Sequence, residues 1–476
     1  MVRSIGNVEK DAQVRAVASG ALSSGDAVVV NSDGTVSSIF TNITIFNNAS
    51  TFVPAIATNG SGTFLLIYRN DGDAQAGMAV AGTISGSTVT LGTAVEITSE
   101  MGNSRLSTAV VYDPDNSKFV IAYRDANNNS YLTSRVVTVT GTTVSLGTAV
   151  VVDSQTVTTV DMAYDTSANK VVFGWRGGSG TLVAGAVGTV SGTSISFGST
   201  TIVASKRPEY INVVYDSNAN KTAFFYRDDA DTRDGYYVVC TVSGTSISGG
   251  STATFDAADV SYISAAYDST AQKIVIAYRD EGNSGGYGSA IVGTISGTSM
   301  TFGSEVTFSD GSTGDISVSY DSTNNKTFIF CEKSNTLQAI IGTVSGTSIS
   351  FGTPATLSSG GGKSYTSSTF SVSSGKVLVA FRDQAASNIG TLLTVDSTFA
   401  GGNLTSENFI GFADGAYADT QSAAINSTCS VDRNQTSLTA GQKYYVQTDG
   451  ALGLTAADPS VEAGTAISAT EILVKG

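Results

Sequence analysis

The sequence predicts an all-β protein, a seven-bladed β-propeller inserted into a small β domain. Three observations predict this fold class. Short sequence words recur at a period of about 52 residues, which is typical of a propeller. The composition, with 52 Gly, five Pro and only 14% charged residues, favours strands and tight turns. No repeat unit has room for a helix of about ten residues with a 3.6-residue period.

The first repeated word is a hairpin turn followed by an alternating strand. Its copies read SGTSISFG or a close variant, and they begin at residues 85, 140, 191, 243, 296 and 345. In the third copy, Ile195 and Phe197 alternate with Ser194 and Ser196. This alternation indicates a half-buried strand at the outside of a blade.

The second word is an apolar run that ends in an aromatic residue, Arg and an acid. Seven copies occur, at 64–70, 118–125, 171–177, 223–229, 273–280, 327–333 and 376–383. A strand that is apolar at every position, such as FVIAY, must be covered on both faces, as it is between two blades. A third word, Tyr-Asp before a polar turn, precedes most copies. We therefore predict four strands in each unit.

The two ends of the repeat region are expected to close the ring. The seventh unit stops after 388–395 without a hairpin word, and 33–46 precedes the first unit without a blade of its own. We predict that about 36–45 supplies the missing outer strand by pairing with 388–395, which removes an open sheet edge. The predicted propeller is then 36–396. Residues 1–35 and 397–476 form one discontinuous anchoring domain, with strands in 443–453 and 466–476.

Composition and charge exclude several classes of function. A net charge of −15 and a pI near 4.4 disfavour nucleic acid as a partner. The chain has no His, and its three Cys form no CxxC pair, so we expect no His-based catalysis, metal site, disulfide scaffold or cofactor. No apolar run of about 18 residues and no apolar segment near the N-terminus appear, so we expect neither membrane insertion nor export.

The head and tail of the chain resemble the terminal modules of bacteriophage tail-fibre and related virion structural proteins, those of marine phages and cyanophages especially. The resemblance is carried by GALSSGDAVVVNSDGTVSSI near the N-terminus, NFIGFADGAYADT, and SLTAGQKYYVQTDGALGLTAADPSVEAGTAISATEILVKG from 437 onward. The GTVSGTSISFG and YDSTNNK repeats also resemble repeat regions of such fibres. The resemblance implies a component of the virion surface and supplies no catalytic residue.

The Arg of the second word is the most prominent candidate for a ligand-binding residue. Clustered Arg side chains hold a sugar carboxylate in propeller sialidases, but an active site should break a repeat, and these residues are the repeat. The SxDxGxTW word of that family is also missing. We therefore expect each Arg to pair with its adjacent acid, such as Asp125 or Asp280, or with a Tyr-Asp carboxylate. The six residues are Arg69, Arg124, Arg176, Arg227, Arg279 and Arg382.

The sixth unit departs from the pattern, with Cys331, Glu332 and Lys333 in place of the aromatic residue, Arg and acid. A functional thiol at Cys331 is one interpretation. We favour the simpler one, in which Cys331 replaces a buried aromatic side chain.

The loop DDADTRDGYY (228–237) is the strongest candidate for a binding loop. Asp229, Asp231 and Asp234 offer oxygens to Ca²⁺, but no Glu closes an EF-hand site, so we expect a solvated turn. Aromatic residues end this loop and its equivalents at 125–131 and 280–287, which predicts a glycan-binding rim. The aromatic candidates are Tyr131, Tyr236, Tyr237 and Tyr287.

The expected function is non-covalent attachment of a virion to its host as a tail-fibre or receptor-binding component. One alternative is a capsid or tail decoration protein without receptor binding, and a third is a polysaccharide-degrading glycosidase. No Asp/Glu pair stands out from the repeat, so we expect no enzyme. Expected partners are other virion proteins, host surface glycan and further copies of the chain, with a trimer as our guess. The expected location is the virion, after assembly in the reducing bacterial cytoplasm, which the absence of predicted disulfides suits.

Overall fold

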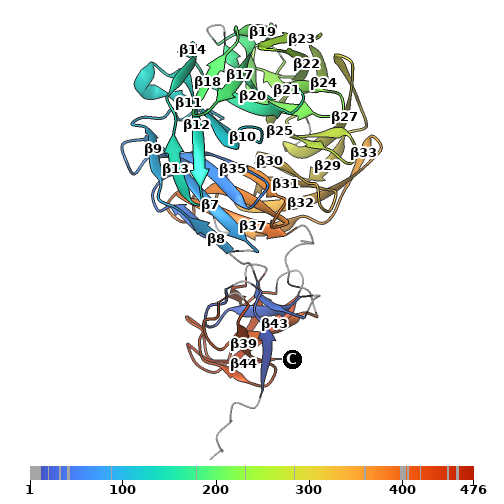
Figure 1. Ribbon diagram of the computed structural model, residues 1–476. Helices are drawn as coiled ribbons and strands as arrows, with labels where there is room; N and C mark the ends of the chain where they lie inside the picture. The colour runs from blue at the N-terminus through green and yellow to red at the C-terminus, as the bar shows by residue number, and fades with distance from the viewer. Residues whose placement is uncertain are drawn as a thin grey trace, which may run out of the picture.

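The protein is all-β, and its strands form nine sheets in the part of the chain that the structure describes (Figure 1). The computed structural model describes residues 12–19, 21–31, 34–39, 43–86, 88–104, 106–177, 180–230, 232–282, 285–358, 361–396, 404, 407–418, 420–447, 450–456 and 460–475. The one helical element within these ranges is a short 3₁₀ helix, Ala126–Asn128. None of the described residues forms a helix long and apolar enough to cross a membrane.

Seven of the sheets follow one another between Thr44 and Asp396 and give a propeller-like repeat fold (Figure 1). The innermost strand of each sheet ends in the Tyr-Asp word or its equivalent. These strands are β5 (Thr51–Thr58), β10 (Thr108–Asp113), β15 (Val160–Asp165), β20 (Pro208–Asp216), β25 (Val260–Asp268), β30 (Thr313–Asp321) and β35 (Lys363–Ser371). Each contacts the next around a central axis, and β35 contacts β5, so the ring is closed.

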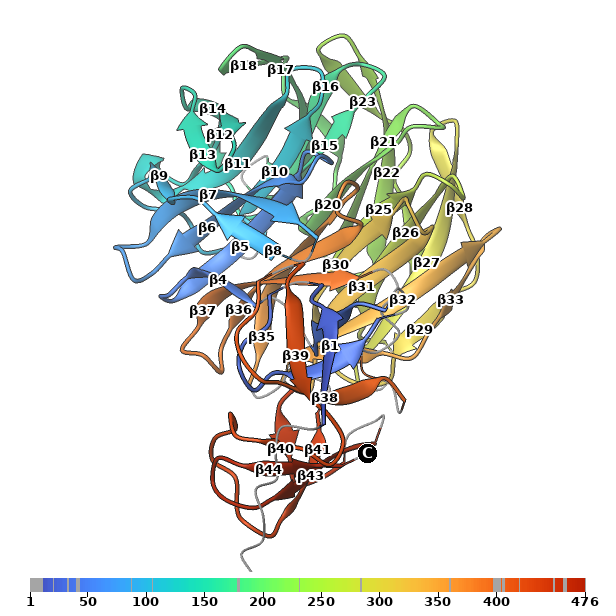
Figure 2. The same ribbon diagram turned by 60° about the horizontal axis from the view of Figure 1, so that its bottom comes forward.

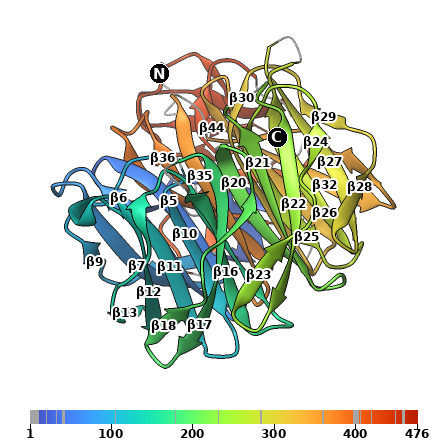
Figure 3. The same cartoon turned by 90° about the horizontal axis from the view of Figure 1, so that it is seen from above.

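The second and third strands of each sheet lie further from the axis. The second strands carry the apolar runs: β6 (Thr63–Asn70), β11 (Lys118–Asp125), β16 (Lys170–Gly177), β21 (Lys221–Asp228), β26 (Lys273–Asp280), β31 (Lys326–Lys333) and β36 (Lys376–Asp383). The third strands are β7 (Ala76–Ser85), β12 (Tyr131–Thr140), β17 (Leu182–Ser191), β22 (Gly235–Ser243), β27 (Tyr287–Ser296), β32 (Thr336–Ser345) and β37 (Ile389–Asp396). Neighbouring sheets pack side by side around the ring, which Figure 3 shows from its edge, and the second strands are buried on both faces.

The outer strand of six sheets is split into two pieces, where the sequence predicted one. Both pieces pair with the third strand, the first with its end and the second with its beginning. The first pieces are β8 (Thr88–Leu91), β13 (Thr143–Leu146), β18 (Ser194–Phe197), β23 (Ser246–Gly249), β28 (Ser299–Phe302) and β33 (Ser348–Phe351). The second pieces are β9 (Val95–Thr98), β14 (Val150–Thr156), β19 (Thr201–Ala204), β24 (Ala253–Asp256), β29 (Val306–Ser309) and β34 (Ala355–Ser358).

The outer strand breaks at the glycine that ends the hairpin word. A backbone oxygen of the next sheet lies so close to this glycine that no side chain fits there. A Cβ on Gly198 would lie 1.8 Å from the backbone oxygen of Thr245, in the hairpin turn of the next sheet. Gly147 meets the oxygen of Thr193 in the same way, at 2.0 Å. Gly352 precedes the one sheet without such a hairpin, and there the nearest atom is 3.8 Å away. The repeated word thus packs each of the first five sheets closely against the next one.

The ring is closed by pairing between segments from its two ends. Strand β4 (Thr44–Asn47) pairs antiparallel with β37, with Thr44 opposite Leu392 and Asn47 opposite Gly390. The expected segment, 36–45, is therefore right only at its C-terminal end. Residues Val36–Ser38 form β3 and pair with β2 (Ala27–Val30) in another sheet.

Of the two remaining sheets, one combines strands from both ends of the chain and the other contains C-terminal strands alone (Figure 2). One has the order β1 (Gln13–Val17), β39 (Ser422–Asn426), β38 (Phe409–Ala413), β2 and β3. The other has the order β40 (Val431–Asp432), β44 (Ile472–Val474), β43 (Val461–Ala466), β41 (Lys443–Val446) and β42 (Leu452–Gly453). Val29 and Phe412 of the first sheet share one buried cluster with Val446, Val461 and Ile472 of the second. The N-terminal and C-terminal segments therefore pack as one unit.

Candidate binding site at one mouth of the ring

The innermost strands are distorted at the mouth of the ring where they begin. In β5, β20, β25, β30 and β35 a bulge places two residues opposite one residue of the second strand. Six residues here have φ in the left-handed region, which is unusual for side chains other than glycine. They are Val53 (43°), Leu106 (58°), Tyr210 (51°), Tyr262 (53°), Asp315 (50°) and Tyr365 (56°).

The aromatic residue of the second word lies opposite the bulge in four of the five sheets, and Cys331 takes this place opposite β30. The register passes from Arg227 to Phe225 across the bulge of β20, so Tyr226 faces the extra residues. Tyr278 has the same place opposite β25. Backbone strain that recurs at one mouth of a ring is a reason to look for a site there.

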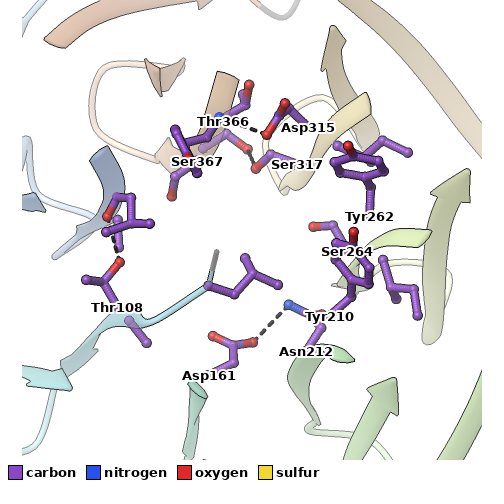
Figure 4. Close-up of a pocket in the computed structure, with 18 of the residues that line it drawn as sticks. Thr108, Asp161, Tyr210, Asn212, Tyr262, Ser264, Asp315, Ser317, Thr366 and Ser367 are labelled. Carbon is purple, nitrogen blue, oxygen red and sulfur yellow. Dashed lines mark hydrogen bonds between the residues drawn. The ribbon is translucent and has the colours of Figure 1, made fainter. Parts of the chain in front are cut away.

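The bulged residues border a cavity of about 230 Å³ on the ring axis (Figure 4). All seven innermost strands, or the residue just before them, contribute to its wall. The volume is below the roughly 300–1,000 Å³ usual for drug-sized ligands, so it suits one small polar unit. Figure 4 shows polar groups from several sheets around this space, among them Thr108, Asp161, Ser264 and Ser367.

Most of these polar groups bind the neighbouring strand. Asp161 accepts hydrogen bonds from Asn212 Nδ2 (2.8 Å) and from the backbone N–H of Val213 (2.7 Å). Asn212 Oδ1 in turn accepts from the N–H of Ala265 at 2.9 Å. The same position in later sheets makes equivalent links, Ser264 with Val318 (3.1 Å) and Ser367 with Ile56 (3.3 Å). Hydrogen bonds from these side chains therefore link successive innermost strands around the axis of the ring.

Asp161 is the charged member of this series. Enclosure of the carboxyl group away from bulk water raises its pKa to about 7, although the backbone N–H groups of Val213 and Met162 act in the opposite direction. Asp315 faces Asp161 across the cavity (Figure 4) and accepts from the N–H of Tyr365 at 2.8 Å. Both cavity carboxylates thus serve as acceptors for the next strand.

The repeated Arg residues lie at the same mouth, but the acid partners that we expected are wrong. Arg69 pairs with Asp71 (2.6 Å) and Arg279 with Glu281 (3.1 Å), in each case the acid two residues onward. Adjacent residues in a strand point to opposite faces, so the acid next to Arg faces away from it. Asp125 accepts from Thr98 Oγ1 (2.8 Å), and Asp280 accepts from the N–H of Gly282 (2.9 Å).

The Tyr-Asp carboxylates do not pair with these Arg residues either. Asp216 accepts the N–H groups of Asn218 and Ala219, both at 2.9 Å, within its own turn. Asp268 does the same with Thr270 and Ala271. This word therefore closes the turns at the other end of the strands.

The surroundings of the Arg residues differ from sheet to sheet. Arg227 contacts Glu209, Asp229 (3.8 Å) and Asp259 (3.7 Å), and Arg176 reaches Asp229 at 4.0 Å. These contacts link neighbouring sheets at the rim.

Arg124 and Arg382 have no carboxylate within 4.0 Å among the described residues. Arg124 Nη1 donates to Ser104 Oγ at 2.6 Å. The guanidinium of Arg382 lies 4.5 Å from the ring centroid of Phe52 and 5.3 Å from that of Tyr365. The repeat is therefore chemically asymmetric at this mouth.

The described acids of the loop at 228–237 take part in ion pairs and hydrogen bonds. Asp229 also contacts Arg207 at 3.4 Å, and Asp234 accepts from Thr232 Oγ1. Asp231 lies outside the described residues. Within the described ranges, no group of three or more His, Cys, Asp or Glu side chains is placed to hold a metal ion.

The four aromatic candidates of the rim have different environments. Tyr237 is buried, and its hydroxyl donates to the carbonyl of Met300 at 3.1 Å, so the prediction that it lies on a binding rim is wrong. Strand β22 begins at Gly235, and the strand alternation turns Tyr237 inward. Tyr236 is half-buried, with Lys206 Nζ 4.2 Å from its ring centroid. Tyr131 and Tyr287 are half-buried first residues of third strands.

Cys331 lies in the hydrophobic core, as its interpretation as a replaced aromatic residue requires. It is fully buried against Ile329 and Ile340, and this burial raises the pKa of the thiol to about 12. Glu332, which takes the place of Arg in this sheet, accepts from the N–H of Asn335 at 2.6 Å. Lys333 pairs with Asp310 at 2.5 Å.

The sequence analysis did not predict the cavity or the side chains that link its strands, although the sequence contains a pattern that marks them. A polar residue stands three places before the Tyr of the Tyr-Asp word in successive units, as Asp161, Asn212, Ser264 and Ser317. This repeated polar position, at the same place in successive innermost strands, marks the axis of the ring.

Comparisons with known proteins find no matching family model and no matching curated protein. Solved structures give distant similarities. NanB sialidase from Streptococcus pneumoniae is 10% identical, with a TM-score of 0.43 over 75% of this chain and 71% of that chain. Aleuria aurantia lectin is 12% identical (TM-score 0.41; 65% and 97% covered), and the polysaccharide lyase Uly1 is 11% identical (0.46; 81% and 98%). These similarities are too distant to indicate what this chain binds or does.

Proposed function

We propose that the chain is a bacteriophage virion protein that attaches the particle to the host cell surface. In this proposal the ring is a seven-bladed propeller that serves as the binding head. It is inserted into a small anchoring β domain made by the two ends of the chain. The shared core of Val29, Phe412 and Val461 supports the insertion, and the resemblance of both ends to phage fibre modules supports the virion setting.

The observation that carries the binding function is the mouth of the ring. Strained residues border a cavity of about 230 Å³ there, and three of them are Tyr side chains that line it. Arg227 and Arg382 lie over two of these rings, those of Tyr210 and Tyr365, on a chain whose net charge is −15. Aromatic faces and fixed guanidinium groups are suited to holding a polar, ring-shaped ligand such as a sugar unit.

The proposed binding involves no chemical step. A glycosidase needs two carboxyl groups free to exchange protons or to attack the sugar. The cavity carboxylates Asp161 and Asp315 instead accept backbone N–H groups of the next strand, as the neutral Asn212 and Ser264 do at the position of Asp161. We therefore favour binding over catalysis as the function of the cavity. Release of reducing ends from host polysaccharide by the purified chain would reverse this order.

The remaining parts of the proposal concern partners and location. The small domain would dock on other virion proteins, and three copies would present their ring mouths outward. The virion would be assembled in the bacterial cytoplasm.

The test is competition for adsorption. Purified full-length chain is added to host cells before the phage, and both bound protein and free phage are counted. The proposal predicts that the chain binds cells and lowers adsorption in proportion to occupancy. A folded chain that neither binds nor competes would contradict attachment and would favour the decoration protein.

A further inference from the structure

The Arg residues on both sides of the ring closure form a group that differs from the others. Arg382 and Arg69 lie 4.5 Å and 5.5 Å from the ring centroid of Phe52. Arg124 is on the next sheet, where β10 is tied to β5 by a hydrogen bond from Thr108 Oγ1 to the carbonyl oxygen of Val53 (2.6 Å). We call Arg382, Arg69 and Arg124 the seam arginines.

The seam arginines carry more positive charge than their neighbours balance. Asp71 lies 2.6 Å from Arg69 and is the one carboxylate within 4.0 Å of the three among the described residues. Asp383, the acid next to Arg382, is taken by Lys363 at 2.6 Å. Asp125, the acid next to Arg124, faces Thr98. Three guanidinium groups therefore share one close counter-charge.

Holding three guanidinium groups near one carboxylate costs electrostatic free energy, and a bound anion would offset this cost. Arg124 is partly buried, and this burial, together with the charge of Arg69, lowers the pKa of its guanidinium. The Nε atoms of Arg124 and Arg382 are enclosed without a hydrogen-bond acceptor among the described residues, as are those of Arg227 and Arg279, which adds to the cost. Arg227 and Arg279 differ in having carboxylates within 4.0 Å. A carboxylate is the anion whose two oxygens match the guanidinium fork.

The surrounding groups favour a sugar as the bearer of that carboxylate. Phe52 and Tyr365 lie 5.4 Å apart, and Tyr365 borders the cavity. The cavity has room for one small polar unit. Across the ring, Arg279 is already paired with Glu281, and Glu332 replaces Arg. An anion is therefore favoured at the seam side of the mouth.

We propose that the seam arginines bind the carboxylate of an acidic sugar unit of the host surface, with the sugar ring against Phe52 and Tyr365 at the mouth of the cavity. This inference rests on the proposed attachment function and specifies its ligand class. Hexuronates and sialic-type sugars share the carboxylate and are the two sources to be compared.

The test measures binding of the full-length chain to three probes by titration calorimetry. The probes are a hexuronate oligosaccharide, its carboxyl-reduced neutral counterpart and a sialylated oligosaccharide. We expect saturable binding to at least one of the acidic probes and at least tenfold weaker binding to the neutral one. Equal binding to the acidic probe and its reduced counterpart, or no binding to either acidic probe, would overturn the inference.

Variants locate the site on the ring. Arg382→Gln and Arg124→Gln should each weaken binding of the acidic probe at least about tenfold, and Arg124→Lys less, because Lys keeps the charge but loses the fork. Arg279→Gln is the matched control at the same repeat position and should change affinity less than twofold. Equal losses in all of these variants would contradict a seam site. Thermal melts of each variant verify that it is folded.

The same variants separate this inference from the proposed function. If Arg382→Gln and Arg124→Gln bind host cells as well as the original chain does, attachment stands and the carboxylate site is wrong. If the original chain binds neither cells nor sugars, both proposals fail.

Discussion

Replacing Asp161 by Asn should stabilise the ring at neutral and alkaline pH. Asp161 occupies a position at which the next three sheets carry uncharged Asn212, Ser264 and Ser317. Its oxygen Oδ2 accepts the hydrogen bonds from Asn212 Nδ2 and from the N–H of Val213, and the single side-chain oxygen of Asn can accept the same two. The substitution therefore removes the charge and keeps both hydrogen bonds to the next strand.

The magnitude follows from the raised pKa of this carboxyl group. The pKa moves from 3.8 to about 7 on folding, so the folded chain holds a proton that the unfolded chain releases between these pH values. Stability contributed by the protonated group is complete below about pH 4 and is lost as the pH rises to about 7. About 3 pKa units at 1.36 kcal/mol each set an upper limit of roughly 4 kcal/mol. Because the carboxylate borders the cavity, we expect about 1–4 kcal/mol.

The assay is urea denaturation of both proteins at several pH values between 4 and 8. The unfolding midpoint of Asp161→Asn should exceed that of the original chain at pH 8, and the two should converge near pH 4. Asp73→Asn removes an exposed carboxylate and serves as the control, with no such divergence expected. An Asp161→Asn variant that is less stable at pH 8, or a constant difference across the range, would refute the reasoning.

Three further predictions concern the ring and its thiols. Gly198→Ala should lower the free energy of unfolding by about 1–3 kcal/mol because the new Cβ would meet the oxygen of Thr245, whereas Gly352→Ala has space; equal denaturation midpoints would contradict the interlock. Ile45→Pro should weaken the pairing of β4 with β37 and speed amide exchange in β36 and β37 but not in β26, as mass spectrometry can measure; unchanged exchange would show that the seam does not depend on β4. Ellman's reagent should modify one thiol in the folded chain, that of exposed Cys429, and three in denaturant; fast reaction of a second thiol in the folded state would contradict the burial of Cys240 and Cys331.

Much of the ring could be predicted from the sequence because each unit solves the same packing problem. The apolar runs fall on second strands that are buried on both faces, and the missing hairpin of the last unit points to β4. The split outer strand was missed because its cause lies in another sheet, where the oxygen of Thr245 approaches Gly198.

The candidate site was harder to predict because it depends on which way single side chains point. Tyr237 was placed on a rim, but strand β22 begins two residues earlier than the loop pattern indicates and turns this side chain inward. The partners of Arg69 and Arg279 lie two residues onward because neighbours in a strand face opposite ways. Tyr takes the first position of three of the bulges that border the cavity, as Tyr210, Tyr262 and Tyr365, but Val53 and Asp315 take it in the other two, so no single residue type marks the left-handed backbone.

The most direct test of the central claim is amide exchange of the full-length chain with and without polysaccharide extracted from host cells. The account predicts slower exchange at the beginnings of β5, β10 and β35, where the seam side of the mouth lies, and unchanged exchange in the Tyr-Asp turns at the other end of the strands. Protection confined to those turns or to the sheets of the small domain, or no protection anywhere, would contradict attachment through the mouth of the ring.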